Sequence, residues 1–200
     1  LVGLANTVET PTPETDSLVR RALFATLTNV DFDADSIRAL TDDVRKASGG
    51  KGEIRMSSVW CAQEDIRSLK SLILFGVRGM AAYAYHAEVL GETDPEVDSM
   101  MYEALRAVGS DMGAERLLSV ALGLGKANLA CMAMLDRANT ARFGVPSPAT
   151  VSRDVAAGPA IIVIGHDLED LRLILEQTEG KGINVYTHGE MLPAFGYPEL

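Results

Sequence analysis

The chain has 200 residues, of which 47% are hydrophobic and 23% charged, enough apolar content to bury the core of one large domain or two small ones. Its formal net charge of −10 argues against a surface built to follow nucleic-acid phosphates or an anionic membrane, so we expect neither nucleic acid nor membrane as a partner. Cys61 and Cys131 lack the paired spacing of a zinc or iron–sulfur motif, and free thiols are typical of a reducing cytoplasm.

The ends of the sequence indicate a piece of a longer protein. The chain opens at Leu1 without an initiator methionine and stops at Leu200, directly after a turn rich in proline and glycine. It does not open with a basic segment followed by an apolar run, so we predict a cytoplasmic protein without a secretory signal. Residues 1–16 contain Pro11 and Pro13 among several threonines and glutamates, a composition that predicts a flexible lead-in in which little packs.

Between residues 17 and 140, apolar side chains recur at helical spacing. The longest apolar run, 64–90, is interrupted by charged residues such as Lys70 and Arg78, which favours a buried helix of a soluble bundle over a membrane span. Consecutive amphipathic helices with short connections typically pack as an antiparallel bundle, which we predict for 17–140. The spacing places its helices at 17–28, 36–47, 64–90, 96–108 and 112–138.

Residues 141–159 are rich in proline and glycine, and this change of composition predicts a linker. Residues 160–200 then have the pattern strand, helix, strand. Ile161 to Ile164 form a short buried-strand signal, Asp167 is an N-cap candidate for the helix, and a second strand covers 183–186. Because such crossovers join parallel strands, we predict a multi-helical bundle followed by the start of a parallel α/β domain.

Two chemically versatile side chains follow these two predicted strands. His166 comes just after the first strand and Glu190 just after the second. Ligand crevices in parallel sheets lie outside the carboxyl ends of the strands, and adjacent strands are only about 5 Å apart. The two side chains can therefore reach one point, as a shared pair of metal ligands would. The alternative interpretation is structural, with His166 satisfying its own turn and Glu190 capping a following helix.

The residues that follow the linker resemble those of a known family. The segment 165–200, with its GHDL and YTHGEMLPA motifs, resembles the hybrid cluster proteins, which are also called hydroxylamine reductases. Earlier segments resemble the same family, so that the resemblance extends over nearly the whole chain from about Ala22 onward. These segments are ALFATLTNVDFD at 22–33, LILFGVRGMAAYAYHAEVLGE at 72–92 and ARFGVPSPATV at 141–151.

The resemblance implies a helical domain followed by Rossmann-like α/β domains, with residues 160–200 as the start of a truncated one. It also implies a hybrid iron–sulfur–oxygen cluster held by one histidine, two glutamates and cysteines. The family's histidine falls on His166 and one of its glutamates on Glu190, which makes both residues cofactor-binding metal ligands. The implied reaction reduces hydroxylamine to ammonia and water with electrons from a donor protein, and nitric oxide is a further associated substrate.

The sequence also departs from the family pattern. The cysteines that bind a separate iron–sulfur cubane, the thiolate ligands of the hybrid cluster and its second glutamate have no counterpart in residues 1–200. Phe195 stands where the family usually has histidine in the motif LPAHGYP. Because two ligands are too few for a cluster, we expect this polypeptide to be inactive by itself.

Two other interpretations of the sequence remain open. In the first, His166, His188 and Glu190 form a mononuclear metal site of two histidines and one carboxylate. The structural interpretation of His188 is that it orients Glu190 by a hydrogen bond and is not a ligand. The third reading is a non-catalytic helical interaction module with a vestigial α/β tail.

Overall fold

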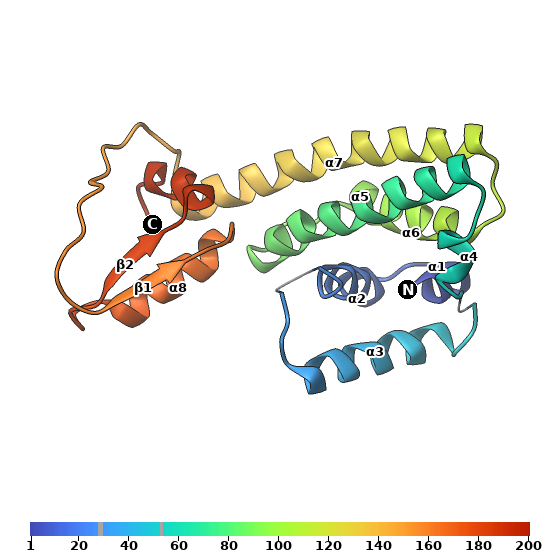
Figure 1. Ribbon diagram of the computed structural model, residues 1–200, viewed down its shortest axis with the longest axis horizontal. Coiled ribbons are helices and arrows are strands. Elements are labelled where there is room, and N and C mark those ends of the chain that lie inside the picture. Colours follow the sequence, from blue (N-terminus) through green and yellow to red (C-terminus); the bar gives the residue numbers. More distant parts are fainter. Residues whose placement is uncertain (28–29, 53) are drawn as a thin grey trace. The chain divides into compact units, whose positions relative to one another are not determined.

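The computed structural model describes residues 1–27, 30–52 and 54–200. The chain forms two compact units, Leu1–Leu135 and Asp136–Leu200 (Figure 1). The first unit is helical in its described residues, and the second combines the end of a long helix with a parallel strand pair and a helix. The predicted fold class is therefore confirmed.

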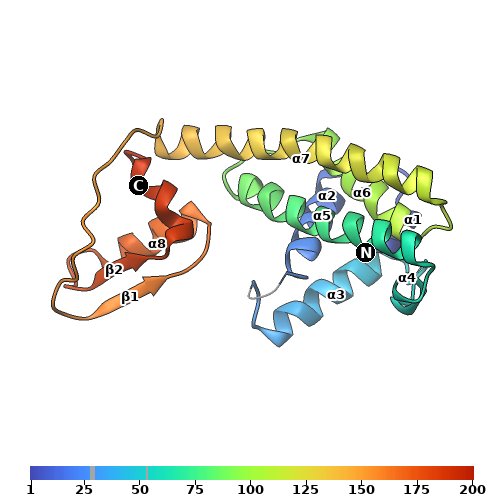
Figure 2. The ribbon, with the colours of Figure 1, turned by 45° about the horizontal axis from the view of Figure 1, so that its top comes forward.

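The first unit is a helical bundle in which α5 packs against both α2 and α6, and α5 and α6 lie side by side in Figures 1 and 2. The short helix α1 contacts α3 and α6. The helices that begin in this unit are α1 (Val2–Thr7), α2 (Pro13–Phe24), α3 (Ala34–Ser48), α4 (Ser57–Trp60), α5 (Glu64–Val89), α6 (Pro95–Gly109) and α7 (Ala114–Phe143).

The prediction that little packs in residues 1–16 is wrong. The segment Val2–Thr7 is helix α1, and its Leu4 and Ala5 are fully buried in the core. Arg106 of α6 donates a hydrogen bond from Nε to the Ala5 carbonyl oxygen at 2.7 Å, which fastens α1 to the bundle. The prolines that suggested flexibility mark the entry to the next helix, because a proline fits the first helical turn without loss of a hydrogen bond.

Helix α2 begins earlier than predicted because of its N-cap. Thr12 and Thr15 form a reciprocal capping box that satisfies the amides of both residues, and Pro13, which has no amide hydrogen, occupies the first turn. Helix α2 ends at Phe24, and Thr28, its predicted last residue, lies outside the described residues. The other predicted helices agree with α3, α5, α6 and α7 to within a few residues.

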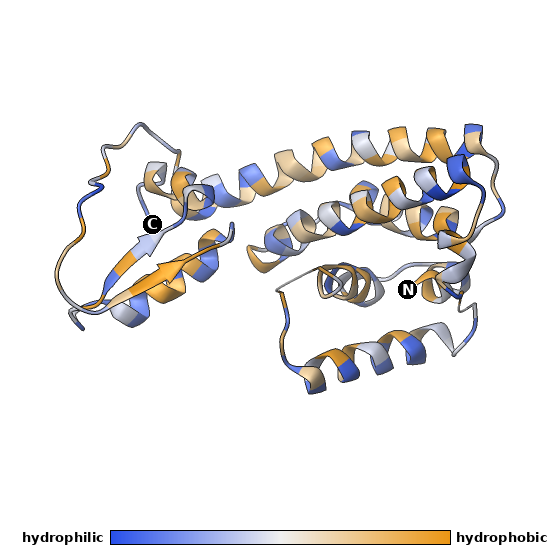
Figure 3. Cartoon of the chain, in the orientation of Figure 1, coloured by the Kyte–Doolittle hydropathy of each residue, from blue (hydrophilic) through white to orange (hydrophobic). Residues whose placement is uncertain are grey.

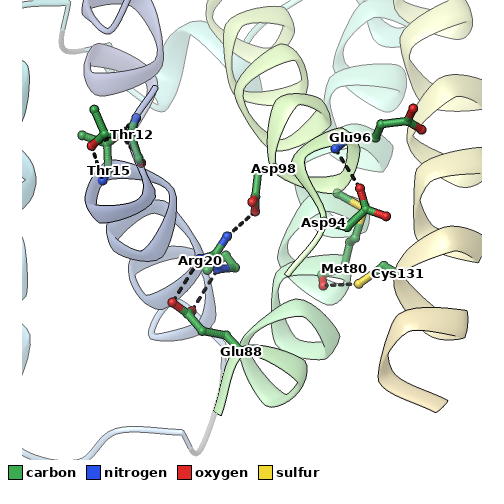
Figure 4. Close-up of polar contacts among 9 residues, drawn as sticks. All are labelled: Thr12, Thr15, Arg20, Met80, Glu88, Asp94, Glu96, Asp98 and Cys131. Carbon is green, nitrogen blue, oxygen red and sulfur yellow. Dashed lines mark hydrogen bonds and ion pairs between the residues drawn. The ribbon is translucent and has the colours of Figure 1, made fainter. Parts of the chain in front are cut away.

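Close approach of α5 and α7 depends on a glycine. A Cβ at Gly76 would lie 3.0 Å from the Leu124 side chain, so an alanine would force that leucine to move. One turn along, Cys131 of α7 donates from Sγ to the Met80 carbonyl oxygen at 3.5 Å (Figure 4). Burial, and then the nearby Asp98 and Asp94, raise the pKa of the Cys131 thiol to about 12. Cys131 is therefore a neutral packing residue rather than a ready thiolate ligand.

Helix α7 has two apolar faces. One face enters the core through Leu117, Val120, Leu124 and Met134. The helix is long and apolar enough to cross a membrane by length and composition alone, and 28% of its apolar window is buried. Its other face exposes a row of leucines and a methionine, at Leu118, Leu122, Leu129 and Met132.

A buried ion-pair network joins α2, α5 and α6. Arg20 of α2 is 4% exposed and donates two hydrogen bonds to Glu88 of α5, at 2.9 and 3.0 Å, and a third to Asp98 of α6 (Figure 4). Burial raises the pKa of Asp98 more than Arg20 lowers it. Burial acts on Glu88 in the same sense, but hydrogen bonds from Arg20 and Ser17 and the Arg20 charge outweigh it and lower the pKa of Glu88.

The second unit contains a parallel pair of strands, β1 (Ala160–Val163) and β2 (Asn184–Thr187), in the register Val163 opposite Thr187. Between them runs helix α8 (Leu168–Thr178), and after β2 comes the 3₁₀ helix η1 (Gly189–Gly196). Leu168 and Leu171 are the buried residues of α8. Parallel pairing through a helical crossover is as predicted.

The prediction that Ile161 to Ile164 form a buried strand is wrong for residues 1–200. Ile162 and Ile164 are each 73% exposed, and β1 is the orange strand in Figure 3. In the described residues the sheet has two strands, and a sheet of this size cannot close a core around an apolar strand.

We predict that Arg20→Met destabilises the helical unit by about 3 kcal/mol, because it leaves the buried Asp98 carboxylate without its cation. The matched control is Arg38→Met, which removes an exposed ion pair with Asp35 and should change stability by less than about 1 kcal/mol. Urea denaturation followed by circular dichroism measures both variants. Equal effects of the two substitutions would contradict a structural role for the buried network.

The lowered pKa of Glu88 predicts a pH-dependent contribution to stability. An unfolded glutamate has a pKa of about 4.3, so the ionised Glu88 stabilises the fold above that pH and loses this contribution as the pH falls through its lower folded pKa. The cost of Glu88→Gln should be largest at pH 7 and shrink below about pH 4. Asp98→Asn should show the opposite pH dependence. Because the pKa of Asp98 is raised in the fold, its carboxyl contributes more to stability as the pH falls, so the cost of Asp98→Asn should grow toward low pH. A Glu88→Gln cost that stays constant between these pH values refutes the prediction.

Candidate cofactor-binding site

The carboxyl ends of β1 and β2 lie at one edge of the sheet. Beyond the last paired residues, Val163 and Thr187, the His188 amide donates a hydrogen bond to the Val163 carbonyl oxygen at 2.9 Å. This bond carries the strand pairing one residue further. The two segments that leave the sheet, Ile164–His166 and His188–Glu190, therefore start from a fixed separation.

The structure brings His166 and Glu190 together. His166 Nε2 lies 3.5 Å from Glu190 Oε2, and the two side chains are 71% and 48% exposed. A separation of this size is typical of two side chains that face a common point, and it is short enough for both to ligate one ion after small rotations. The convergence that strand-end reasoning predicted is thus present in the fold, and the ligand role of the pair remains a prediction.

The turn before His166 requires a glycine. Gly165 has φ +149, a backbone conformation that residues with a Cβ seldom adopt. Directly after His166, Asp167 is the N-cap of α8 and accepts a hydrogen bond from the Glu169 amide at 3.1 Å. His166 is therefore held between a glycine turn and a capped helix start.

An ionic network that sequence reasoning missed supports the first turn of α8. Glu169 accepts hydrogen bonds from Arg172 of the same helix, between 2.6 and 3.0 Å, and lies 3.5 Å from Arg142 near the end of α7. The hydrogen bonds from Arg172, opposed by burial, lower the pKa of Glu169. The spacing of Glu169 and Arg172 on one helix face was the signal available in the sequence. The network braces the first turn of α8, which begins two residues after His166.

On the other segment, His188 is the N-cap of η1. Its Nδ1 accepts a hydrogen bond from the Glu190 amide at 3.4 Å, and its carbonyl oxygen accepts one from the Met191 amide at 2.9 Å. Phe195, the residue that departs from the family pattern, lies on η1 and is 43% exposed. No metal role follows for Phe195, because its ring carries no donor atom.

The donors present fit one side of an iron site. Imidazole and carboxylate both ligate iron, and His166 and Glu190 are exposed at a strand edge where a larger group has room. The described residues contain no group of three or more histidine, cysteine or acidic side chains that could hold a metal. Cys61 and Cys131 belong to the helical unit. In the described residues, His166 and Glu190 could therefore supply only part of a ligand set.

Comparison with known proteins relates the chain to one family. The sequence model of the Prismane/CO dehydrogenase family matches residues 1–200. The chain is 53% identical to the hydroxylamine reductase of Moorella thermoacetica over 78% of its length and 36% of that protein. It is 41% identical to the hydroxylamine reductase of Maridesulfovibrio salexigens, over 94% of the chain and 40% of that protein. The chain therefore spans about two fifths of the length of the relatives it matches.

We predict that Gly165→Ala disturbs His166 although nothing lies within 4 Å of the added methyl group. Its effect comes from backbone strain, about 1–3 kcal/mol at such a φ. The matched control is Gly189→Ala, which also has open space around its Cβ but no positive φ. Backbone and His166 ring shifts in NMR spectra of the two variants measure the difference. Unchanged His166 signals in Gly165→Ala would refute the prediction.

Proposed function

The chain belongs to the Prismane/CO dehydrogenase family, and from this membership we propose that it is the part of a hydroxylamine reductase that supplies His166 and Glu190 to an iron–sulfur cluster. The observation that carries the proposal is the 3.5 Å approach of His166 Nε2 to Glu190 Oε2 at the carboxyl ends of two parallel strands. Three hydroxylamine reductases among its relatives, at 41% to 53% identity, support the assignment of the activity.

The proposed reaction is the reduction of hydroxylamine by two electrons and two protons. The nitrogen–oxygen bond breaks, and the products are ammonia and water. The electrons come from a donor protein, and nitric oxide is a second candidate substrate. We place the complete enzyme in the cytoplasm, with a hybrid iron–sulfur–oxygen cluster at this site and a separate iron–sulfur cubane elsewhere in the polypeptide.

Ligand type explains why this pair suits such a cluster. When bound, the cluster supplies electrons and an iron with a coordination position open to a small nitrogen compound. Imidazole and carboxylate are harder donors than thiolate, and they favour binding of oxygen and nitrogen ligands at the iron that they hold. His166 would hold such a cluster as a neutral imidazole, and Glu190 would hold it as a carboxylate.

The rest of the chain positions these two donors. The hydrogen bond from His188 to Val163 fixes the separation of the segments that carry them, and the Glu169–Arg172 network holds the helix start next to His166. The remaining ligands must come from polypeptide outside residues 1–200, so the chain by itself is expected to be inactive. Cys131 is not part of the proposed ligand set, since burial keeps it a neutral thiol.

We predict that His166→Ala and Glu190→Gln, each in the full-length reductase, lower hydroxylamine reduction by more than about 100-fold, because loss of even an outer-shell partner of a metal ligand costs 10–100-fold. The control is Glu179→Gln, at the far end of α8, which should keep full activity. Anaerobically prepared protein is assayed by hydroxylamine-dependent oxidation of a reduced dye, with iron content measured in parallel. Wild-type turnover in both ligand variants would exclude the proposed site.

A further inference from the structure

We propose that the His188 imidazole is a positioning residue that caps η1 and thereby orients Glu190, and that it is not itself a metal ligand. The inference deepens the proposed function and rests on it, since it assumes that Glu190 is a ligand. It selects between the two interpretations that the sequence left open for His188.

Three hydrogen bonds anchor His188. Its amide donates to the Val163 carbonyl oxygen at 2.9 Å, its carbonyl oxygen accepts from the Met191 amide at 2.9 Å, and its Nδ1 accepts from the Glu190 amide at 3.4 Å. The backbone at His188 is extended, with φ −70 and ψ 161, which is the conformation of an N-cap residue. The amide bond attaches His188 to the sheet, and the bonds to its carbonyl oxygen and Nδ1 attach the start of η1 to His188.

The side-chain bond also determines which nitrogen carries the proton. A neutral imidazole has one acceptor and one donor nitrogen. A neutral imidazole whose Nδ1 accepts the Glu190 amide carries its proton on Nε2, so in this arrangement neither nitrogen offers a free lone pair to a metal. Ligation by His188 would require the cap to break or the tautomer to change. His166, in contrast, directs its Nε2 at the Glu190 carboxylate.

The cap matters for Glu190 because of where Glu190 lies. It is the second residue of η1, and the first turn of any helix has amides without an intrahelical partner. Loss of the His188 acceptor releases the Glu190 amide and lets that turn fray. The carboxylate then samples positions farther from His166, which weakens joint ligation without removing a donor atom.

Capping can be tested on the 200-residue chain without any cluster. His188→Ala should speed hydrogen exchange of the Glu190 amide severalfold, and His188→Asn, which keeps a good N-cap acceptor, should restore the wild-type rate. The control is Asp33→Ala, which removes the equivalent cap of α3 and should leave the Glu190 amide unchanged. Equal Glu190 exchange in wild type and His188→Ala would overturn the proposal.

Ligation is tested in the full-length reductase, through iron content and the electron paramagnetic resonance spectrum of the cluster. A positioning role predicts about a tenfold loss of iron affinity in His188→Ala and recovery in His188→Asn. A ligand role predicts equal loss in both variants and would overturn the proposal. The two proposals can fail separately. If His166→Ala and Glu190→Gln keep full iron occupancy, the proposed function is wrong, whereas slower Glu190 exchange in wild type than in His188→Ala would still support the capping role of His188.

Discussion

The parallel pairing of β1 with β2 is the constraint on which the candidate site depends. Its register places Val163 opposite Thr187, and the bond from His188 to Val163 extends the ladder to the point where both segments leave the sheet. Two donors that are far apart in sequence thereby meet within 3.5 Å. A shift of one residue would turn alternate side chains to the other face and separate the pair.

In the helical unit the buried cation Arg20 joins three of the helices, α2, α5 and α6. Arg20 contacts carboxylates of two other helices, so the three elements cannot rearrange independently. A buried ion-pair network of this kind adds less net stability than its short contacts suggest, because the cost of removing the charges from water offsets their attraction. Its physical effect is to disfavour any packing that leaves one of the three charges buried and alone. The bundle is thus specified by charge as well as by apolar volume.

Much of the fold could be predicted from local pattern. The periodicity of 64–90 and the cap at Asp167 correspond to observed helices, because caps and apolar stripes are encoded by neighbouring residues. Helix α1 was not predictable in this way. Its six residues are too few to show a period, and they are helical because Leu4 and Ala5 find a place in the core. The exposure of Ile162 likewise depends on which elements are present to cover it.

For the candidate site, the sequence by itself determined the donor types and their positions at the ends of two strands, since strand and turn signals are local. It also carried the family motifs. Tertiary structure decided the rest: the actual approach of His166 to Glu190, the Glu169–Arg172 support, and the use of Nδ1 of His188 as a cap. These depend on strand register and on the path of the turns. Both result from long-range hydrogen bonding, and no short window of residues encodes either.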